Sequence, residues 1–351
     1  MLGILYAALG AFTFSFNNVM MRRGVVTGSV LQGMALTVPI GAMSFVVMTA
    51  AFGALGQIAV FPMAALAWLA GQGVVHFVMG RYCNYKSNQL MGVNLAAPVV
   101  QLQVPFAMLL AVVTLHETFT VLQAVGSALM LGGSFITQRR AGEGRTAPKA
   151  HVTTAPGREK EQIGVPGVPT VPEPKSTFQP RVFSGYVFGA GAAICYGSSP
   201  LMARQAFLHA PVANAVAGGC IAYAAATLVF ILVLLKPGSW RDIKDMKLEN
   251  ARWFLSAAVL VAISQAFVYA SLAIAPLMVV TPILQLSLVF RLFLSQWINR
   301  DHEVMNTAVL IGAGAAVLGS LLVALPTDQL SAVVALPPPL ADILRFHLAG
   351  H

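Results

Sequence analysis

The sequence predicts an all-α polytopic membrane protein with ten transmembrane helices, arranged as two inverted repeats of five helices. Three observations predict this fold: an apolar composition, ten apolar segments of spanning length, and polar identities that recur at a nearly constant offset. Of the 351 residues, 57% are hydrophobic and only 9% are charged. A soluble domain carries about 25% charged residues. Most of the surface of this chain must therefore face lipid.

The formal net charge of +9 could suggest nucleic acid as a partner. The basic residues instead form short clusters between long apolar runs, as loop charges do in membrane proteins, so we expect no nucleic acid. Cys83, Cys195 and Cys220 lie in or beside apolar runs and form no CxxC pair, and we interpret them as packing residues. The apolar N-terminus has no basic region before it and predicts a first membrane helix, not a cleaved signal.

Ten segments have the roughly 20 mainly apolar residues that a helix needs to cross the hydrocarbon core. They are residues 2–21, 31–52, 63–84, 91–114, 118–138, 183–203, 211–235, 252–273, 276–298 and 304–325. Residues 139–182, with seven prolines, separate five segments from five. This composition predicts a disordered linker, and we expect residues 326–351 to form a flexible tail.

The two halves, residues 1–138 and 183–325, repeat one another. Gly3, Met20 and Arg22 match Gly185, Met202 and Arg204, whereas Pro98 and Gln101 match Pro282 and Gln285. His116 and Glu117 match His302 and Glu303, and Gly126 and Gly133 match Gly312 and Gly319. Because each repeat has an odd number of spans, the halves face opposite ways. Inverted repeats are typical of carriers, whose site lies near the midplane between the halves.

Residues 94–136 combine a proline in the fourth helix, an acidic residue at the turn and a glycine-rich fifth helix. This segment resembles the EamA repeat of the drug/metabolite transporter superfamily, and residues 279–322 resemble a weaker second copy. The resemblance covers residues 1–138 and 183–325. It implies a ten-helix carrier and says little about the substrate. The long proline-rich linker departs from the family pattern.

Basic residues cluster on one side of the predicted bundle, in the connections after odd-numbered spans. They are Arg22, Arg23, Arg81, Lys86, Lys236, Arg241, Lys244, Lys247, Arg252, Arg300 and those of the linker. Basic loops stay in the cytoplasm during insertion, which predicts a cytoplasmic linker and external termini. Ten-helix members of the resembling family are usually described with both termini inside, so the two arguments disagree.

Polar and ionisable residues inside the spans are the candidate site, because each is costly in hydrocarbon. The predicted solute-binding residues are Asn17, Asn18, His76, Arg81, Gln101, Gln265, Gln285 and Arg291. Alternatives remain open. The two arginines could extend their charges to the membrane surface, His76 could be a neutral packing residue, and the amides could only join helices. We expect Glu117 and Glu303 to stabilise the N-termini of the helices that they precede.

No enzyme motif is found: GAGAAVLG at 312–319 lies in a membrane helix, and no HExxH, GxSxG or P-loop occurs. We expect no enzymatic activity, cofactor or metal. No acidic residue lies deep in a span, which disfavours cationic solutes and favours anionic or zwitterionic ones. We expect a secondary carrier of a small metabolite or drug-like solute, acting by alternating access as a monomer or homodimer in the bacterial inner membrane. The alternatives are a scaffold that recruits a partner through the linker, and a flippase for lipid-linked substrates.

Overall fold

The computed structural model describes residues 2–115, 119–143, 179–208, 215–274, 283–284, 286–303, 306–324 and 347–349. The first half holds α1 (Leu2–Thr27), α2 (Val30–Ala51), η1 (Leu55–Val60), α3 (Met63–Gly73), η2 (Val74–Gly80), α4 (Arg81–Met91), α5 (Val93–Val100), α6 (Gln103–Leu115), β1 (Phe119–Thr120) and α7 (Val121–Glu143). The second holds α8 (Val182–Leu208), α9 (Ala215–Leu234), α10 (Ser239–Lys244), α11 (Leu248–Ile274), α13 (Ser287–Ile298), η4 (Arg300–His302), α14 (Thr307–Ala324) and β2 (His347–Ala349). The prediction of an all-α membrane protein is confirmed.

Among the described residues, six helical stretches are long and apolar enough to cross a membrane: Leu2–Thr27, Val30–Ala51, Met63–Met91, Val93–Thr114, Val216–Leu234 and Leu248–Val268. Val121–Gly133, Ser287–Ile298 and Thr307–Val323 are apolar but shorter. Each of the ten predicted spans contains helix in its described residues, yet only six stretches meet the length and hydropathy requirement. The count of ten therefore stays a prediction.

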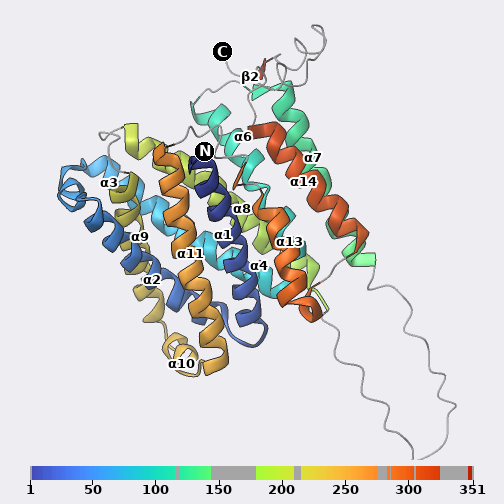
Figure 1. The fold of residues 1–351 in the computed structure, drawn as a ribbon, viewed down its shortest axis with the longest axis horizontal. Helices are drawn as coiled ribbons and strands as arrows, with labels where there is room; N and C mark the ends of the chain where they lie inside the picture. Colours follow the sequence, from blue (N-terminus) through green and yellow to red (C-terminus); the bar gives the residue numbers. More distant parts are fainter. Residues whose placement is uncertain are drawn as a thin grey trace, which may run out of the picture.

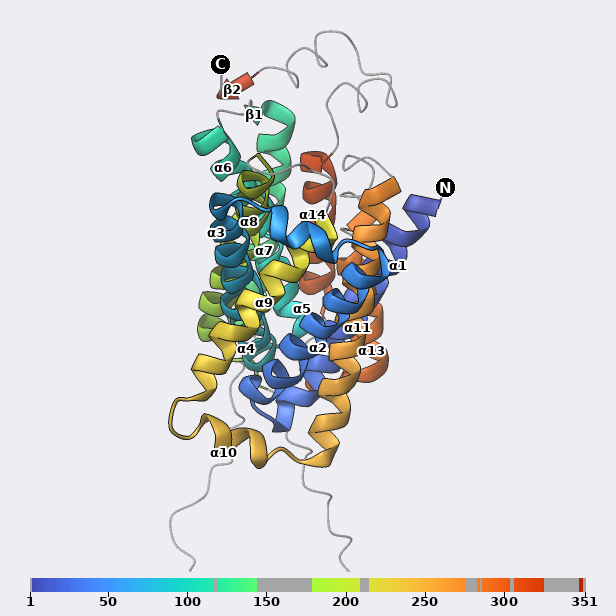
Figure 2. The same cartoon turned by 90° about the vertical axis from the view of Figure 1, so that its left-hand side faces the viewer.

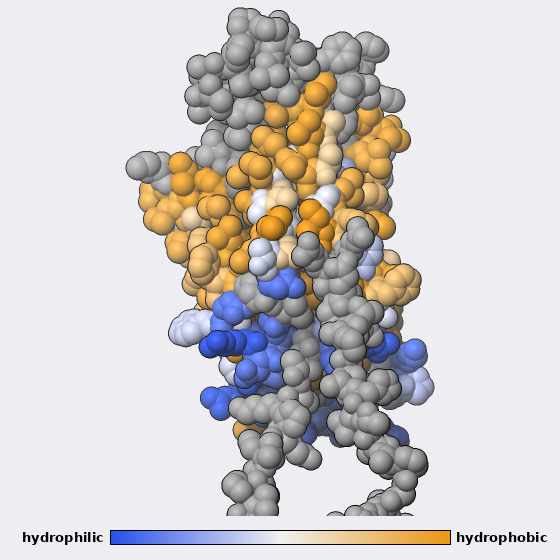
Figure 3. Space-filling model, turned by 90° about the vertical axis from the view of Figure 1, so that its right-hand side faces the viewer, coloured by the Kyte–Doolittle hydropathy of each residue, from blue (hydrophilic) through white to orange (hydrophobic). Residues whose placement is uncertain are grey.

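The helices form an elongated bundle whose two ends differ in polarity. The start of α1 and β2 lie at one end, and α10 and η4 lie toward the other (Figure 1). Figure 2 shows α10 crossing below α9 and α11 at this second end. Apolar side chains cover the middle of the bundle, and hydrophilic ones gather at the second end (Figure 3). We call this second end, which carries Arg23, α10 and η4, the basic end.

Large apolar side chains point outward on several helices, as a lipid-facing surface requires. Met43, Leu232 and Phe293 are each more than 60% exposed, although they lie in α2, α9 and α13. A soluble protein would bury most of such side chains. We therefore infer that these exposed apolar side chains face the acyl chains.

Helix pairs join the two halves of the sequence. Three helices of the first half pack along helices of the second half: α1 along α11 and α13, α2 along α9 and α11, and α3 along α8 and α9. α4, α5 and α6 all contact α8, and α7 packs along α14. β1 pairs with β2, which ties residues 347–349 to the start of α7.

Glycines allow α7 and α14 to approach closely. A Cβ on Gly126 would lie 2.6 Å from the carbonyl oxygen of Gly319, and one on Gly133 would lie 2.5 Å from that of Gly312. The earlier residue of one helix thus meets the later residue of the other, so the helices are antiparallel. Small residues at such crossings supply the van der Waals contact that drives helix association in lipid.

We expect Gly133→Val to destabilise the protein by about 1–3 kcal/mol, because the side chain would press against the backbone of α14. At the adjacent Gly132, a Cβ would have no neighbouring atom within 4 Å, so Gly132→Val is the matched control. Thermal unfolding in detergent measures both. Equal effects of the two substitutions would contradict the close crossing.

Candidate functional site

The third predicted span contains a π-helical segment, η2, between α3 and α4. Such segments widen a helix locally and occur frequently at functional sites. A Cβ on Gly73 would overlap the backbone of Ala222 in α9, and one on Gly80 would lie 2.8 Å from the ring of Tyr196 in α8. Glycine at these two positions lets helices of the second half close around η2, which carries His76 and leads directly into Arg81.

Arg81 is buried, with 4% of its surface exposed. Its Nη1 donates to the carbonyl oxygen of Thr37 at 3.0 Å, and its Nη2 donates to the hydroxyl of Tyr223 at 2.9 Å. The guanidinium also lies 5.2 Å from the ring centroid of Phe77. Among the described residues, no carboxylate lies within 4.0 Å of it. The alternative that Arg81 reaches the membrane surface is therefore wrong, as is its placement in a loop.

Tyr223 is held by aromatic stacking. Its ring centroid lies 3.7 Å from that of Phe77 and 5.0 Å from that of Phe45. A Cβ on Gly41 would overlap the same ring. Tyr223 therefore has little freedom, and its hydroxyl is fixed where Arg81 donates.

His76 lies against the second half through α8. Its Nδ1 is 3.0 Å from Oγ of Ser199, which also accepts a hydrogen bond of 2.9 Å from Nε2 of Gln72. Its ring centroid is 4.7 Å from that of Tyr196. His76 is thus a hydrogen-bonded, partly buried residue of the contact between the halves.

Asparagines of α1 and α4 form a second polar group next to Arg81. Oδ1 of Asn18 accepts from Nδ2 of Asn84 at 3.1 Å and from Nδ2 of Asn88 at 3.3 Å. Asn17 is also buried, and its Oδ1 has no hydrogen-bond partner within the part of the protein that the structure describes. Asn84 and Asn88 were not predicted as site residues; Asn84 was the last residue of a predicted span, and Asn88 lay in the predicted connection that follows it.

Arg291, in α13, is the second buried guanidinium of the site. It is 4% exposed, its Nε has no hydrogen-bond partner among the described residues, and its Cζ lies 5.9 Å from the ring centroid of Phe14 in α1. Within the same described ranges, it too has no carboxylate within 4.0 Å. The alternative that it extends to the membrane surface is therefore wrong.

The three predicted glutamines differ in position. Gln101 is buried where α5 gives way to α6, three residues after Pro98. Gln265 is partly buried in α11. Gln285 lies outside the described residues, so its predicted pairing with Gln101 stays a prediction.

Sequence reasoning missed a buried ion pair between Arg22 and Glu303. Nε of Arg22 lies 3.2 Å from Oε1 of Glu303, and their side chains are 1% and 0% exposed. Oε1 also accepts from the backbone N–H of Val93 at 2.9 Å, and Oε2 accepts from that of Asn94 at 3.0 Å. Glu303 therefore stabilises the N-terminus of α5 and not, as predicted, that of the helix that it precedes. Arg22, predicted as a loop charge, is buried.

Gly92 makes this contact possible. It connects α4 to α5 with a φ of 85°, and a Cβ there would lie 2.6 Å from Oε2 of Glu303. Only glycine adopts this backbone conformation readily. The turn brings the first N–H groups of α5 against a carboxylate from the other half.

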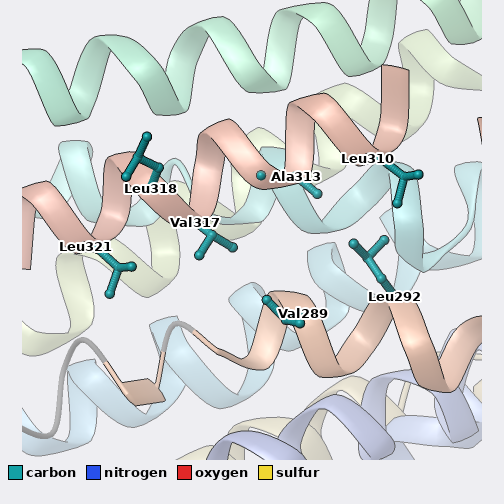
Figure 4. A pocket seen from close by; sticks show the side chains of 8 residues that line it. Val289, Leu292, Leu310, Ala313, Val317, Leu318 and Leu321 are labelled. Carbon is teal, nitrogen blue, oxygen red and sulfur yellow. The ribbon is translucent and has the colours of Figure 1, made fainter. Parts of the chain in front are cut away.

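A pocket of about 270 Å³ lies between α13 and α14. Figure 4 shows its lining, which is apolar: Val289, Leu292, Leu310, Ala313, Val317, Leu318 and Leu321. It offers no polar group for a charged solute. Among the described residues, no group of three histidines, cysteines or acidic residues could hold a metal.

We expect Glu303→Ala to destabilise the protein by about 3–5 kcal/mol, because it leaves the Arg22 charge buried without a carboxylate. The double variant Arg22→Met/Glu303→Ala should lose less than the single one, because both charges are gone. The exposed neighbour Asp301 gives the control, Asp301→Ala, with little effect. Unfolding in detergent measures all three; additive losses would contradict the pairing.

Comparison with known proteins found a family match in the first part of the chain. Residues 1–139 match the EamA-like transporter family, whereas no curated protein matches the sequence. One solved structure, titled only "Crystal structure of protein", is 15% identical, covers 93% of this chain and 98% of its own, and has a TM-score of 0.48. Over its first 139 residues, the chain is therefore similar to the EamA-like transporter family, which is part of the drug/metabolite transporter superfamily.

Proposed function

We propose that this multi-pass membrane protein is a secondary carrier that moves a small anionic or zwitterionic organic solute by alternating access. The observation that carries the proposal is the pair of buried guanidiniums, Arg81 and Arg291, which lie at contacts between the two halves without a carboxylate partner among the described residues. We propose the bacterial inner membrane as its location, a monomer or homodimer as its state, and no enzymatic activity.

The helix pairs support a ten-span, inverted-repeat arrangement. Under the predicted repeat, α1 corresponds to α8, α2 to α9, the α3–α4 span to α11, and the α5–α6 span to the α13 span. If the two halves are exchanged, the contact between α1 and α11 corresponds to the contact between α8 and α4. In the same way, the contact between α2 and α11 corresponds to that between α9 and α3. All four contacts are found in the structure. The same exchange converts α7 into α14. It also converts the contact of Gly126 with Gly319 into that of Gly312 with Gly133, and both contacts are found.

The charge of the site supports an anionic group on the solute. A cation in a membrane interior is costly unless an opposite charge or dipole compensates it. Thr37, Tyr223 and the Phe77 ring compensate Arg81 with dipoles only, and the Phe14 ring faces Arg291. A carboxylate or phosphate between the halves would gain charge-assisted hydrogen bonds at little further cost.

The position of the site supports alternating access. Arg81 and His76 belong to the first half, and their partners Tyr223 and Ser199 belong to the second. Rocking one repeat against the other would change these contacts. A scaffold that acts through its linker would have no need of charged groups at such a contact.

We expect Arg81→Gln to reduce counterflow of an anionic solute in proteoliposomes by at least about tenfold, because the positive charge is lost. Arg81→Lys should also reduce it, since one ammonium cannot donate to both Thr37 and Tyr223 in the same geometry. The exposed Arg252 gives the control, Arg252→Gln. Full flux in Arg81→Gln, at normal expression, would place the site elsewhere.

We expect the linker to face the cytoplasm, because α10, at the basic end of the bundle, carries Arg241 and Lys244. A fluorescent-protein fusion at Ala150 should therefore fluoresce, and a phosphatase fusion there should be inactive. The reverse result would mean that the family's usual orientation holds for this chain.

A further inference from the structure

The contacts of Glu303 describe an anion site as well as an ion pair. Its carboxylate accepts from two backbone N–H groups at the N-terminus of α5, from Val93 and Asn94, and lies against the guanidinium of Arg22. Helix N-termini and guanidinium groups are the two donor types that proteins use most readily for carboxylate and phosphate. The carboxylate in this site comes from the turn between α13 and α14 and is fully buried.

The framework of this anion site does not depend on Glu303 alone. Arg22 also donates from Nη1 to the carbonyl oxygen of Gln89 at 2.8 Å and from Nη2 to that of His302 at 2.8 Å. Oδ1 of Asn94 accepts from Oγ of Ser295 at 2.6 Å, which fastens α5 to α13. Because these contacts remain when the carboxylate leaves, the donors would stay in place for another anion.

A polar seam leads from the candidate solute site to this anion site. Arg81, Asn84 and Asn88 are spaced i, i+3 and i+7 along α4, so they share one face. Asn18 of α1 contacts both asparagines across this seam. At the end of α4, the carbonyl of Gln89 already accepts from Arg22. Between the guanidinium of Arg81 and that of Arg22, the seam therefore offers side-chain amide groups that could hydrogen-bond a polar solute.

We propose that Arg22 and the N-terminus of α5 form an anion site that Glu303 fills as an internal ligand, and that an anionic solute moving from Arg81 toward the basic end displaces Glu303 from it. The second part rests on the proposed function. Glu303 joins α1, the α4–α5 turn and the α13–α14 turn, so its contacts hold both halves together at this end. Displacement would remove the contacts of Glu303 and weaken the connection between the halves at the basic end only when solute is present.

Acetate, a free carboxylate, tests the anion site without any need for transport. In Glu303→Ala, about 100 mM acetate should raise the unfolding temperature by several degrees more than chloride at equal ionic strength, since binding to the native state alone stabilises it. Wild type should show no such difference. The double variant Arg22→Gln/Glu303→Ala should lose the acetate effect, and Glu249→Ala, which removes an exposed carboxylate from the start of α11, should never show it.

An equal response of Glu303→Ala to acetate and chloride, or an undiminished acetate response in the double variant, would overturn the anion site. If Glu303→Ala is not recovered in folded form, Glu303→Ser vacates the same space with a small polar residue and is judged by the same criteria.

Displacement is tested by flux. In Glu303→Ala, acetate should compete for the vacated site, so its half-inhibitory concentration against anion counterflow should fall by roughly tenfold or more relative to wild type. Equal inhibition of both proteins would overturn displacement. Acetate stabilisation in a protein that moves no anion would support the anion site and overturn the proposed function, so the two failures are distinguishable.

Discussion

The cost of placing a positive charge inside an apolar bundle governs the interior of this protein. Three guanidiniums, those of Arg22, Arg81 and Arg291, are each at most 4% exposed, where an uncompensated ion costs several kcal/mol. Arg22 has a carboxylate beside it. Arg81 has a carbonyl, a phenol and an aromatic face. Arg291 has the face of Phe14 and an Nε without a partner among the described residues. The buried charges are thus compensated in different ways, by a carboxylate at Arg22, by hydrogen bonds and ring faces at Arg81, and by a ring face at Arg291.

The backbone departs from regular helix at the places that serve these charges. The π-helical η2 ends at Gly80, immediately before Arg81, and glycines at its borders let α8 and α9 approach. The left-handed turn at Gly92 exposes the N–H groups that hold Glu303. In both cases, glycine permits a conformation or an approach that a side chain would obstruct. Glycines also allow the close crossing of α7 and α14.

The sequence predicted the helices well, because apolar runs of spanning length leave few alternatives to a membrane helix. It placed Arg81 among the site residues and also, wrongly, in a loop, because residues 84–89 are polar. α4 continues through them to Met91, since Asn84 and Asn88 bond to Asn18 and Gln89 donates to carbonyls of Val25 and Gly28. These partners come from another helix, so a local pattern could not reveal them. The role of Glu303 was likewise assigned to the nearest helix, whereas its donors lie about 210 residues away in the sequence.

Under the proposed function, the interior positive charge selects the charge of the solute. Counterflow in proteoliposomes that contain the wild-type protein, over solutes matched in size but differing in charge, tests it most directly. We expect exchange of solutes that carry a carboxylate or phosphate, and little exchange of their amide or ester analogues. Efficient exchange of lipophilic cations, with none of the anions, would contradict it.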